Sequence, residues 1–155
     1  MTEAIEISSL AVVGLGYVGL PLAQEACRSG ISVTGFDTKE SVVSCLMNGE
    51  SYVDDLNSAD IADMLEAGFA ASGDSACIGN ADVIVICVPT PLDADGTPDL
   101  GAVVAATQTV SAVLRAGTLV VLESTTYPGT TENTVKPILE AGSGLTAGSD
   151  FNLAY

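Results

Sequence analysis

Short apolar runs alternate along the chain with longer segments in which apolar residues recur every three or four positions. The first pattern is typical of strands buried on both faces, and the second of helices with one apolar face. The strand-like runs cover residues 10–13, 31–36, 81–88 and 118–122, with shorter candidates at 69–71 and 151–155. The helix-like segments cover residues 18–29, 40–47, 58–67, 101–115 and 131–140.

Turn-forming residues fall between these segments. Gly30 and Gly117 stand where two of the helices are expected to end, and Asn57 or Ser58 is suited to cap the third. Pro137 weakens the last predicted helix, because proline lacks the backbone N–H that a helix interior needs. The remaining loops are predicted at residues 50–57, 91–100, 124–131 and 142–148.

The order of these elements predicts the fold class. Regular alternation of strands and helices favours a parallel sheet covered by helices on both faces. The run at 81–88 is apolar at nearly every position and is therefore expected at the centre of that sheet. We predict an α/β fold of the Rossmann type, a doubly wound parallel sheet forming one domain over residues 1–155. Because the sequence stops on a strand-like run, we expect the domain to be truncated.

The charge balance is strongly acidic. The chain carries 20 acidic residues, four basic residues and no histidine, which gives a formal net charge of −16. Such a chain repels nucleic-acid phosphates and anionic membranes, so neither is expected as a partner. An ordinary acidic surface accounts for the charge. Adaptation to a salt-rich environment, where ions screen the repulsion, is the alternative.

The cysteines and the N-terminal residues indicate a cytoplasmic protein. The spacing of the four cysteines matches no zinc motif, so no metal site is predicted, and buried free thiols are expected instead. Free thiols fit a reducing compartment. No apolar stretch approaches the ~18 residues of a membrane span. The acidic start, Met-Thr-Glu-Ala-Ile-Glu, is not that of a secretory signal.

A glycine-rich motif follows the first predicted strand and opens the first predicted helix. It reads Gly14-Leu-Gly16-Tyr17-Val18-Gly19. In this context the first glycine makes a tight turn, the second lets a pyrophosphate approach the backbone, and the third lets the helix pack on the strand. The amides of Tyr17 and Val18 would face the anion at the positive end of the helix. The alternative is a plain strand-to-helix turn.

Asp37 ends the second predicted strand, 18 residues after Gly19. A carboxylate at this place accepts hydrogen bonds from the adenosine ribose and repels a 2′-phosphate, which favours NAD over NADP. The alternative is that Asp37 caps the next helix, because the run Asp37-Thr-Lys-Glu40 also fits a capping box.

Two further motifs follow the strands expected at 81–88 and 118–122. Val-Pro-Thr-Pro at 88–91 forms a stiff loop and offers the hydroxyl of Thr90 to a ligand. Glu-Ser-Thr-Thr-Tyr-Pro-Gly-Thr at 123–130 offers several hydroxyls at the same sheet edge, where ligands of doubly wound sheets bind. The alternatives are a rigid turn for the first, and for the second a helix cap at Thr130 or Thr131.

Taken in order, these motifs resemble those of the UDP-glucose/GDP-mannose dehydrogenase family. The resemblance rests on residues 14–21, 88–91, 98–100 and 123–130 and extends from about residue 7 to residue 155. The proline at position 89 and the form of the 123–130 motif look most like members that act on UDP-N-acetylhexosamines. Members that act on UDP-glucose usually carry another residue in place of Pro89.

The resemblance implies that the complete protein oxidises the C6 alcohol of a UDP-sugar to a carboxylate in two hydride transfers to NAD. A cysteine of the family holds the intermediate as a thiohemiacetal and then a thioester. Complete members are expected to be homodimers. Carried over by position, the cofactor-binding residues are Gly14, Gly16, Tyr17, Val18, Gly19, Asp37, Pro89, Thr90, Ser124 and Thr125, and Thr125 also has a catalytic role in positioning water.

Two departures from the family pattern matter. Val42 stands where some members have a lysine or arginine, and Lys39 offers a cation only at a different spacing. The nucleophilic cysteine, with its lysine and asparagine partners, falls after Tyr155, so this chain alone is expected to be inactive. Three alternatives remain: a non-catalytic nucleotide sensor, a UDP-glucose 6-dehydrogenase, and a relative of 6-phosphogluconate or hydroxyacid dehydrogenases.

Overall fold

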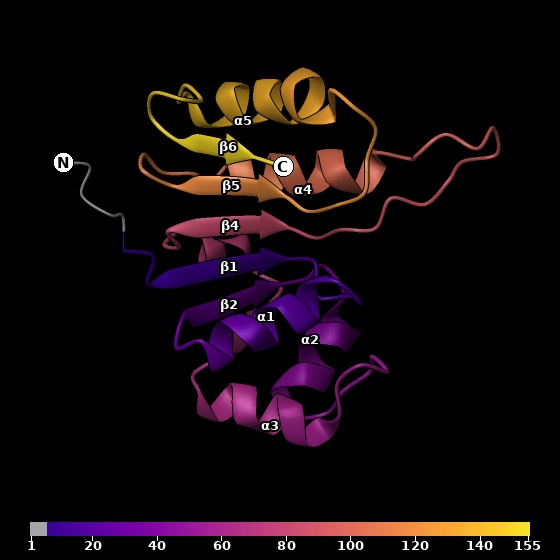
Figure 1. Ribbon diagram of the computed structural model, residues 1–155, viewed down its shortest axis with the longest axis vertical. Coiled ribbons are helices and arrows are strands. Elements are labelled where there is room, and N and C mark those ends of the chain that lie inside the picture. The colour runs from indigo at the N-terminus through magenta and orange to yellow at the C-terminus, as the bar shows by residue number, and fades with distance from the viewer. Residues whose placement is uncertain (1–5) are drawn as a thin grey trace.

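The computed structural model describes residues 6–155, which form one six-stranded parallel sheet with the order β3-β2-β1-β4-β5-β6. All neighbouring strands pair in parallel, and the labelled strand arrows in Figure 1 point the same way. This order is that of a doubly wound Rossmann sheet, so the predicted fold class is confirmed. The strands are β1 (Ser9–Val13), β2 (Ser32–Phe36), β3 (Ala70–Ser72), β4 (Val83–Ile86), β5 (Leu119–Leu122) and β6 (Asn152–Ala154).

Helices cover both faces of the sheet, and Figure 1 shows α1 in front of it and α4 behind it. The side chains of β1 alternate between the two faces. Leu10 and Val12 enter the core under α1 and α3, while Ala11 and Val13 enter the core under α4 and α5. The α-helices are α1 (Gly19–Arg28), α2 (Glu40–Met47), α3 (Ser58–Glu66), α4 (Gly101–Ser111) and α5 (Lys136–Ser143).

The central position predicted for residues 81–88 is confirmed. Strand β4 lies between β1 and β5, and all four of its residues are buried. Two-sided burial explains why the sequence here is continuously apolar rather than alternating. Because the chain winds outward from β1 in one direction and from β4 in the other, a crevice opens at the carboxyl ends of these two strands.

Two helices differ from the predicted bounds. Helix α4 ends at Ser111 rather than at residue 115, and Leu114 then turns into the core at 9% exposure. The last helix begins as a π-helical turn over Thr131–Val135 and continues to Ser143, beyond the predicted end. Pro137 lies in the first turn of α5, directly after the π-helical turn, and the helix continues past it to Ser143.

Smaller differences concern the short elements. The strand expected at 69–71 lies one residue later, and a 3₁₀-helix over Ser75–Ile78 was not predicted. Its signal was Asp74, whose carboxylate accepts a hydrogen bond from the Ala76 amide at 2.9 Å. The cap predicted for α3 is confirmed at Asn57, which forms a full capping box with Asp60.

The cysteines and the helices of residues 6–155 can be compared with the expectations about free thiols and membrane spans. All four cysteines are free, but only Cys27 and Cys87 are buried, while Cys45 and Cys77 are half-buried. None of the helices formed by residues 6–155 has the length and apolar character needed to cross a bilayer. The interpretation of the acidic N-terminal residues concerns mainly residues 1–5, which lie outside the described part.

Candidate functional site

A cleft of about 730 Å³ lies at the carboxyl ends of β1, β2, β4 and β5. Its size is within the range of small-molecule and cofactor sites. The glycine loop after β1, Asp37 after β2 and the loops after β4 and β5 all contribute to its lining. The structure therefore brings together the four motifs that the sequence analysis singled out separately.

The glycine loop is fixed by backbone contacts that leave no room for side chains. Gly14 has φ of +93°, and a Cβ there would lie 2.8 Å from the carbonyl oxygen of Cys87. A Cβ on Gly19 would overlap the carbonyl oxygen of Gly14. These two glycines are thus required by the fold itself, the first for the turn and the second for packing the helix on the strand, as predicted.

Gly16 differs from its two neighbours in the motif. A Cβ there would meet no atom within 4 Å, and Gly16 faces the cleft. Among residues 6–155, no hydrogen bond engages the backbone amides of Gly16, Tyr17 or Val18. These amides lie immediately before α1, whose first turn carries no acidic side chain. Open space beside free donors at a helix N-terminus is the arrangement that suits a pyrophosphate.

Asp37 joins the end of β2 to the glycine loop. One carboxylate oxygen accepts from the Leu15 amide at 3.0 Å, and the other accepts from the Lys39 amide at 2.9 Å. The capping alternative is wrong, because the N-cap of α2 is Lys39 and receives no side-chain cap hydrogen bond. Asp37 lines the cleft with its orientation set by two backbone donors.

The loops after β4 and β5 are tied to each other by hydroxyl groups. The Thr90 hydroxyl donates to the carbonyl of Thr125 at 2.6 Å, and the Ser124 hydroxyl donates to the carbonyl of Val88 at 2.7 Å. Both protons are therefore used within the protein, and towards a ligand these oxygens can only accept. Pro89 also lines the cleft, and Thr125 lines it with an exposed side chain.

The helix-cap alternative for the 123–130 motif is not realised. Thr130 precedes the π-helical turn but makes no side-chain cap bond, and its hydroxyl donates to the Tyr127 carbonyl at 2.9 Å. The helical segment begins at Thr130, at the end of the motif, without a side-chain cap.

The cleft also contains residues that the sequence analysis passed over. Tyr52 lines it from the loop after α2, and Ala102, Ala105 and Thr109 line it from α4. These residues of α4 are small, which leaves room for a ligand in the cleft. Lys39 is the single basic side chain among the lining residues.

Cys87 lies in the cleft lining just after β4 but is only 7% exposed. Burial, with a smaller contribution from the charge of Glu123, raises the pKa of its thiol to about 12. A thiol so strongly protonated is a poor nucleophile at neutral pH. Cys87 therefore does not fill the role of the family's catalytic cysteine, in agreement with the sequence analysis.

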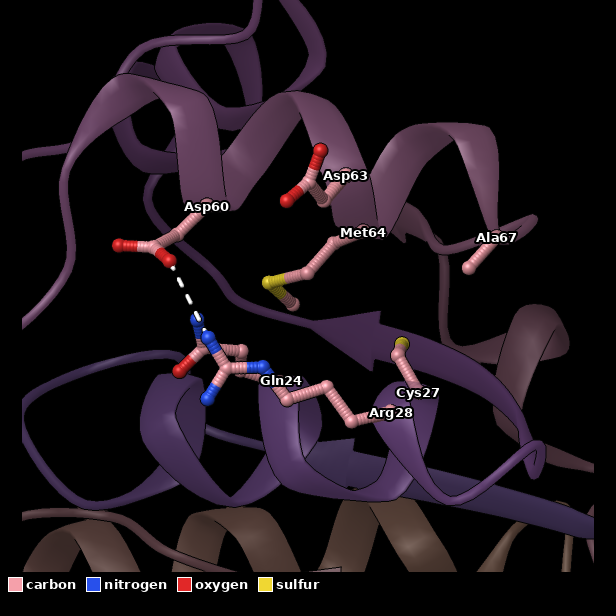
Figure 2. Close-up of a pocket in the computed structure, with 7 residues that line it drawn as sticks. All are labelled: Gln24, Cys27, Arg28, Asp60, Asp63, Met64 and Ala67. Carbon is pink, nitrogen blue, oxygen red and sulfur yellow. Dashed lines mark hydrogen bonds and ion pairs between the residues drawn. The ribbon is translucent and has the colours of Figure 1, made fainter.

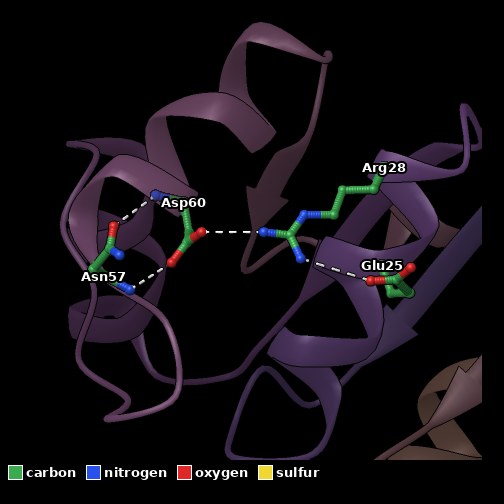
Figure 3. Close-up of polar contacts among 4 residues, drawn as sticks. All are labelled: Glu25, Arg28, Asn57 and Asp60. Atoms are coloured by element: carbon green, nitrogen blue, oxygen red, sulfur yellow. Dashed lines mark hydrogen bonds and ion pairs between the residues drawn. The ribbon is translucent and has the colours of Figure 1, made fainter.

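A second, smaller hollow of about 90 Å³ lies between α1 and α3 (Figure 2). It is too small for a nucleotide, and two of its charged lining residues, Arg28 and Asp60, are paired with each other. Arg28 contacts Asp60 at 3.3 Å and Glu25 at 3.8 Å, and Asp60 also exchanges hydrogen bonds with Asn57 (Figure 3). This hollow belongs to the packing of the two helices.

The fold and the cleft together define a Rossmann-type dinucleotide-binding domain. Comparison with known protein families then identifies the family to which this domain belongs. The model of the UDP-glucose/GDP-mannose dehydrogenase family, NAD binding domain, matches residues 8–155, and the chain belongs to this family. The resemblance and the NAD cofactor inferred from the sequence are both confirmed.

Several characterised proteins are similar to this chain over nearly its whole length. It is 38% identical over 146 residues to the UDP-N-acetyl-D-glucosamine 6-dehydrogenase of Pseudomonas aeruginosa. A solved structure of the UDP-D-ManNAc dehydrogenase of Pyrococcus horikoshii superposes with a TM-score of 0.87 at 35% identity, over 94% of this chain. The GDP-mannose dehydrogenase of Pseudomonas aeruginosa gives 0.84 at 29% identity. The chain spans only about a third of these relatives, 34% and 35% of their lengths.

Proposed function

We propose that this chain is the NAD-binding part of a UDP-N-acetylhexosamine 6-dehydrogenase. Relatives named for UDP-N-acetyl-D-glucosamine and UDP-N-acetyl-D-mannosamine match it at 32–38% identity. Pro89, in the loop after β4, supports this choice over a UDP-glucose 6-dehydrogenase, because it fits the sequence pattern of the N-acetylhexosamine enzymes.

One observation carries the cofactor part of the proposal: the open space beside Gly16, next to the unengaged amides of Tyr17 and Val18. A pyrophosphate placed there gains hydrogen bonds without displacing any protein contact. It also lies at the positive end of α1, which offsets repulsion from an acidic chain. Gly16 thus serves the ligand, whereas Gly14 and Gly19 serve the fold.

The other cleft residues are assigned along the length of the dinucleotide. Asp37 accepts hydrogen bonds from the adenosine ribose, and its charge disfavours a 2′-phosphate. Pro89, Thr90 and Ser124 shape the nicotinamide end of the cleft, where the threonine and serine oxygens accept hydrogen bonds. Thr125 positions the catalytic water with its exposed hydroxyl. When bound along these residues, NAD would supply the hydride acceptor for oxidation of the sugar C6 alcohol.

The covalent steps need groups that the described residues do not offer. The chain has no histidine, and the thiol of Cys87 is protonated and buried. In the complete protein, a nucleophilic cysteine outside this sequence would attack the aldehyde formed in the first oxidation. The UDP-sugar and the partner subunit of a homodimer are likewise proposed for the complete protein.

Calorimetric titration of NAD and NADP into the purified chain tests the proposal. NAD should bind more tightly than NADP, and Gly16→Val should weaken NAD binding by at least about 100-fold, because the new side chain fills the pyrophosphate space. Ala116→Val is the matched control, since Ala116 is exposed in the loop that enters the amino end of β5, whereas the cleft lies at the carboxyl ends of the strands. Tighter binding of NADP, or equal NAD binding by Gly16→Val, would overturn the proposal.

A nucleotide-sensing domain without catalysis is the second candidate. The observation that favours it is the protonated state of Cys87 in the cleft, which leaves the site without a reactive thiol. The reading frame after the codon for Tyr155 distinguishes the two. A following domain that carries a cysteine supports the dehydrogenase, and a stop codon supports the sensor.

A further inference from the structure

Tyr52 is an aromatic residue of the cleft to which the function proposed above gives no role. It belongs to the loop that joins α2 to α3 and lines the cleft together with Asp37, Lys39 and Val42. Its side chain is 38% exposed, so more than half of it is covered although it lies in a loop. A partly exposed aromatic ring in the lining of a cofactor-sized cleft is a contact surface for a ligand.

The loop that carries Tyr52 is held firmly on both sides of the ring. Val53 and Leu56 are buried in the core under α1 and α3, at 3% and 4% exposure. Before the ring, the Glu50 amide donates to the Cys45 carbonyl at 3.0 Å, and the Ser51 hydroxyl donates to the Val53 carbonyl at 3.1 Å. Tyr52 is therefore presented to the cleft by an anchored backbone.

Charged and polar neighbours place Tyr52 at the Asp37 end of the cleft. Burial, followed by the charge of Asp37 and smaller effects of Cys45 and Tyr17, raises the pKa of its phenol to about 12. The ring and the carboxylate assigned to the adenosine ribose line the same cleft, and the phenol stays neutral at physiological pH because its pKa is raised. The adenine base, which is attached to this ribose, must lie within reach of the same neighbourhood.

We propose that Tyr52 is an adenine-binding residue, and that the cleft holds the base between the Tyr52 ring and the apolar side chain of Val42. The proposal rests on the proposed function, because it takes the cofactor to be NAD with its ribose on Asp37. Adenine is flat and uncharged, and it packs well on an aromatic face. At position 42 an apolar side chain, rather than a cation, then completes the site.

The test compares the affinities of NAD and ADP for wild type, Tyr52→Phe, Tyr52→Leu and Tyr52→Ser. Tyr52→Phe keeps the ring and should bind both within about twofold of wild type. The other two variants lose the aromatic face and should bind both about tenfold more weakly, because a base–aromatic contact has roughly that effect. Tyr155→Ser is the control, since Tyr155 is exposed and lies outside the cleft.

Several readouts separate a binding role from a structural one. The thermal midpoint of each unliganded variant is measured, and if Tyr52→Ser is destabilised, Tyr52→Leu decides. The proposal is overturned if Tyr52→Leu binds ADP as tightly as wild type, or if Tyr52→Phe loses as much affinity as Tyr52→Leu. If wild type binds no NAD, or Gly16→Val binds it normally, the proposed function fails and the adenine site fails with it.

Discussion

The carboxylate of Asp37 accepts a hydrogen bond from the backbone amide of Leu15 at 3.0 Å, although the two residues are 22 positions apart. The side chain assigned to the ribose thus also holds the loop assigned to the pyrophosphate. Two parts of one cofactor would be recognised by two parts of the protein whose relative position is fixed before binding. Such preorganisation lowers the entropic cost of binding.

Replacing Asp37 should therefore affect both affinity and cofactor choice. In Asp37→Asn the one side-chain oxygen can accept from Leu15 or from Lys39 but not from both, and the negative charge is lost. We expect NAD to bind about tenfold more weakly, because hydrogen bonds from the ribose to a charged acceptor are stronger. The NAD-to-NADP preference should shrink by at least the same factor, since the 2′-phosphate no longer meets a carboxylate.

Calorimetry with both cofactors measures these changes. Glu66→Gln in α3 is the matched control, because it removes one negative charge from an exposed position away from the cleft. An unchanged preference for NAD in Asp37→Asn would show that another group discriminates between the cofactors.

Alanine substitutions of the three glycines in the loop should differ in how much they lower the stability of the fold. Gly14→Ala and Gly19→Ala place a methyl group against backbone oxygen atoms, and Gly14→Ala also strains a positive φ. Each should lower the free energy of unfolding by at least about 2 kcal/mol. Gly16→Ala enters open space and should stay within about 0.5 kcal/mol of wild type.

Urea unfolding midpoints of the three variants are the measurement. Equal destabilisation by all three substitutions would mean that the loop is packed more tightly around Gly16 than the structure indicates. The contrast matters for function, because a Gly16 variant can be used in binding experiments only if it folds normally.

Local patterns in the sequence predicted the fold well. Continuous apolar runs marked the strands of a two-sided sheet, and Gly30, Asn57 and the glycine loop marked helix boundaries. Helix ends were less predictable. The end of α4 depends on Leu114 reaching a core built by distant strands, which no window around that residue contains.

The cleft was only partly predictable for a similar reason. The motifs led to Gly16 and Asp37 because each follows the end of a strand, and both residues line the cleft. The partners of the hydroxyls of Thr90 and Ser124 lie 35 and 36 residues away, so their internal hydrogen bonds became visible only in the folded chain. Tyr52 belongs to a loop without a recognised motif, and only its place beside Asp37 reveals it.

Asp82 should make the stability of the sheet depend on pH in acid. One of its carboxylate oxygens accepts from the amides and hydroxyls of Ser8 and Ser9, each at 2.9 Å, and these bonds lower its pKa from 3.8 to about 2. Because the folded pKa lies below the unfolded one, the stabilisation is complete above the unfolded pKa. It is lost as the pH falls from about 4 to about 2.

The comparison of wild type with Asp82→Asn isolates this effect from the other carboxylates. Wild type should be more stable than the variant in urea unfolding at about pH 6, and the difference should shrink steadily below about pH 4. Ser9→Ala removes one of the hydroxyl donors to Asp82. The stability difference between wild type and Ser9→Ala should therefore also shrink below about pH 4, but by a smaller amount. A difference between wild type and Asp82→Asn that is constant from neutral pH into acid would contradict the role given to this carboxylate.

Cys87 should react slowly with alkylating reagents, although it lies in the cleft. Its side chain is 7% exposed, and burial together with the charge of Glu123 raises its pKa to about 12. Only about one thiol in 10,000 is then ionised near pH 8, and only the thiolate reacts. In the folded chain, iodoacetamide should label Cys87 at least about tenfold more slowly than the half-buried Cys45.

Peptide mass spectrometry after timed labelling gives both rates in one experiment. Concentrated urea should remove the difference, because unfolding exposes both thiols. Glu123→Gln should speed the labelling of Cys87 modestly, since it removes the charge that disfavours the thiolate, whereas Glu66→Gln should not. Rapid labelling of Cys87 in the folded wild type would show that the cleft does hold a reactive thiol, and a catalytic role for this residue would then have to be considered.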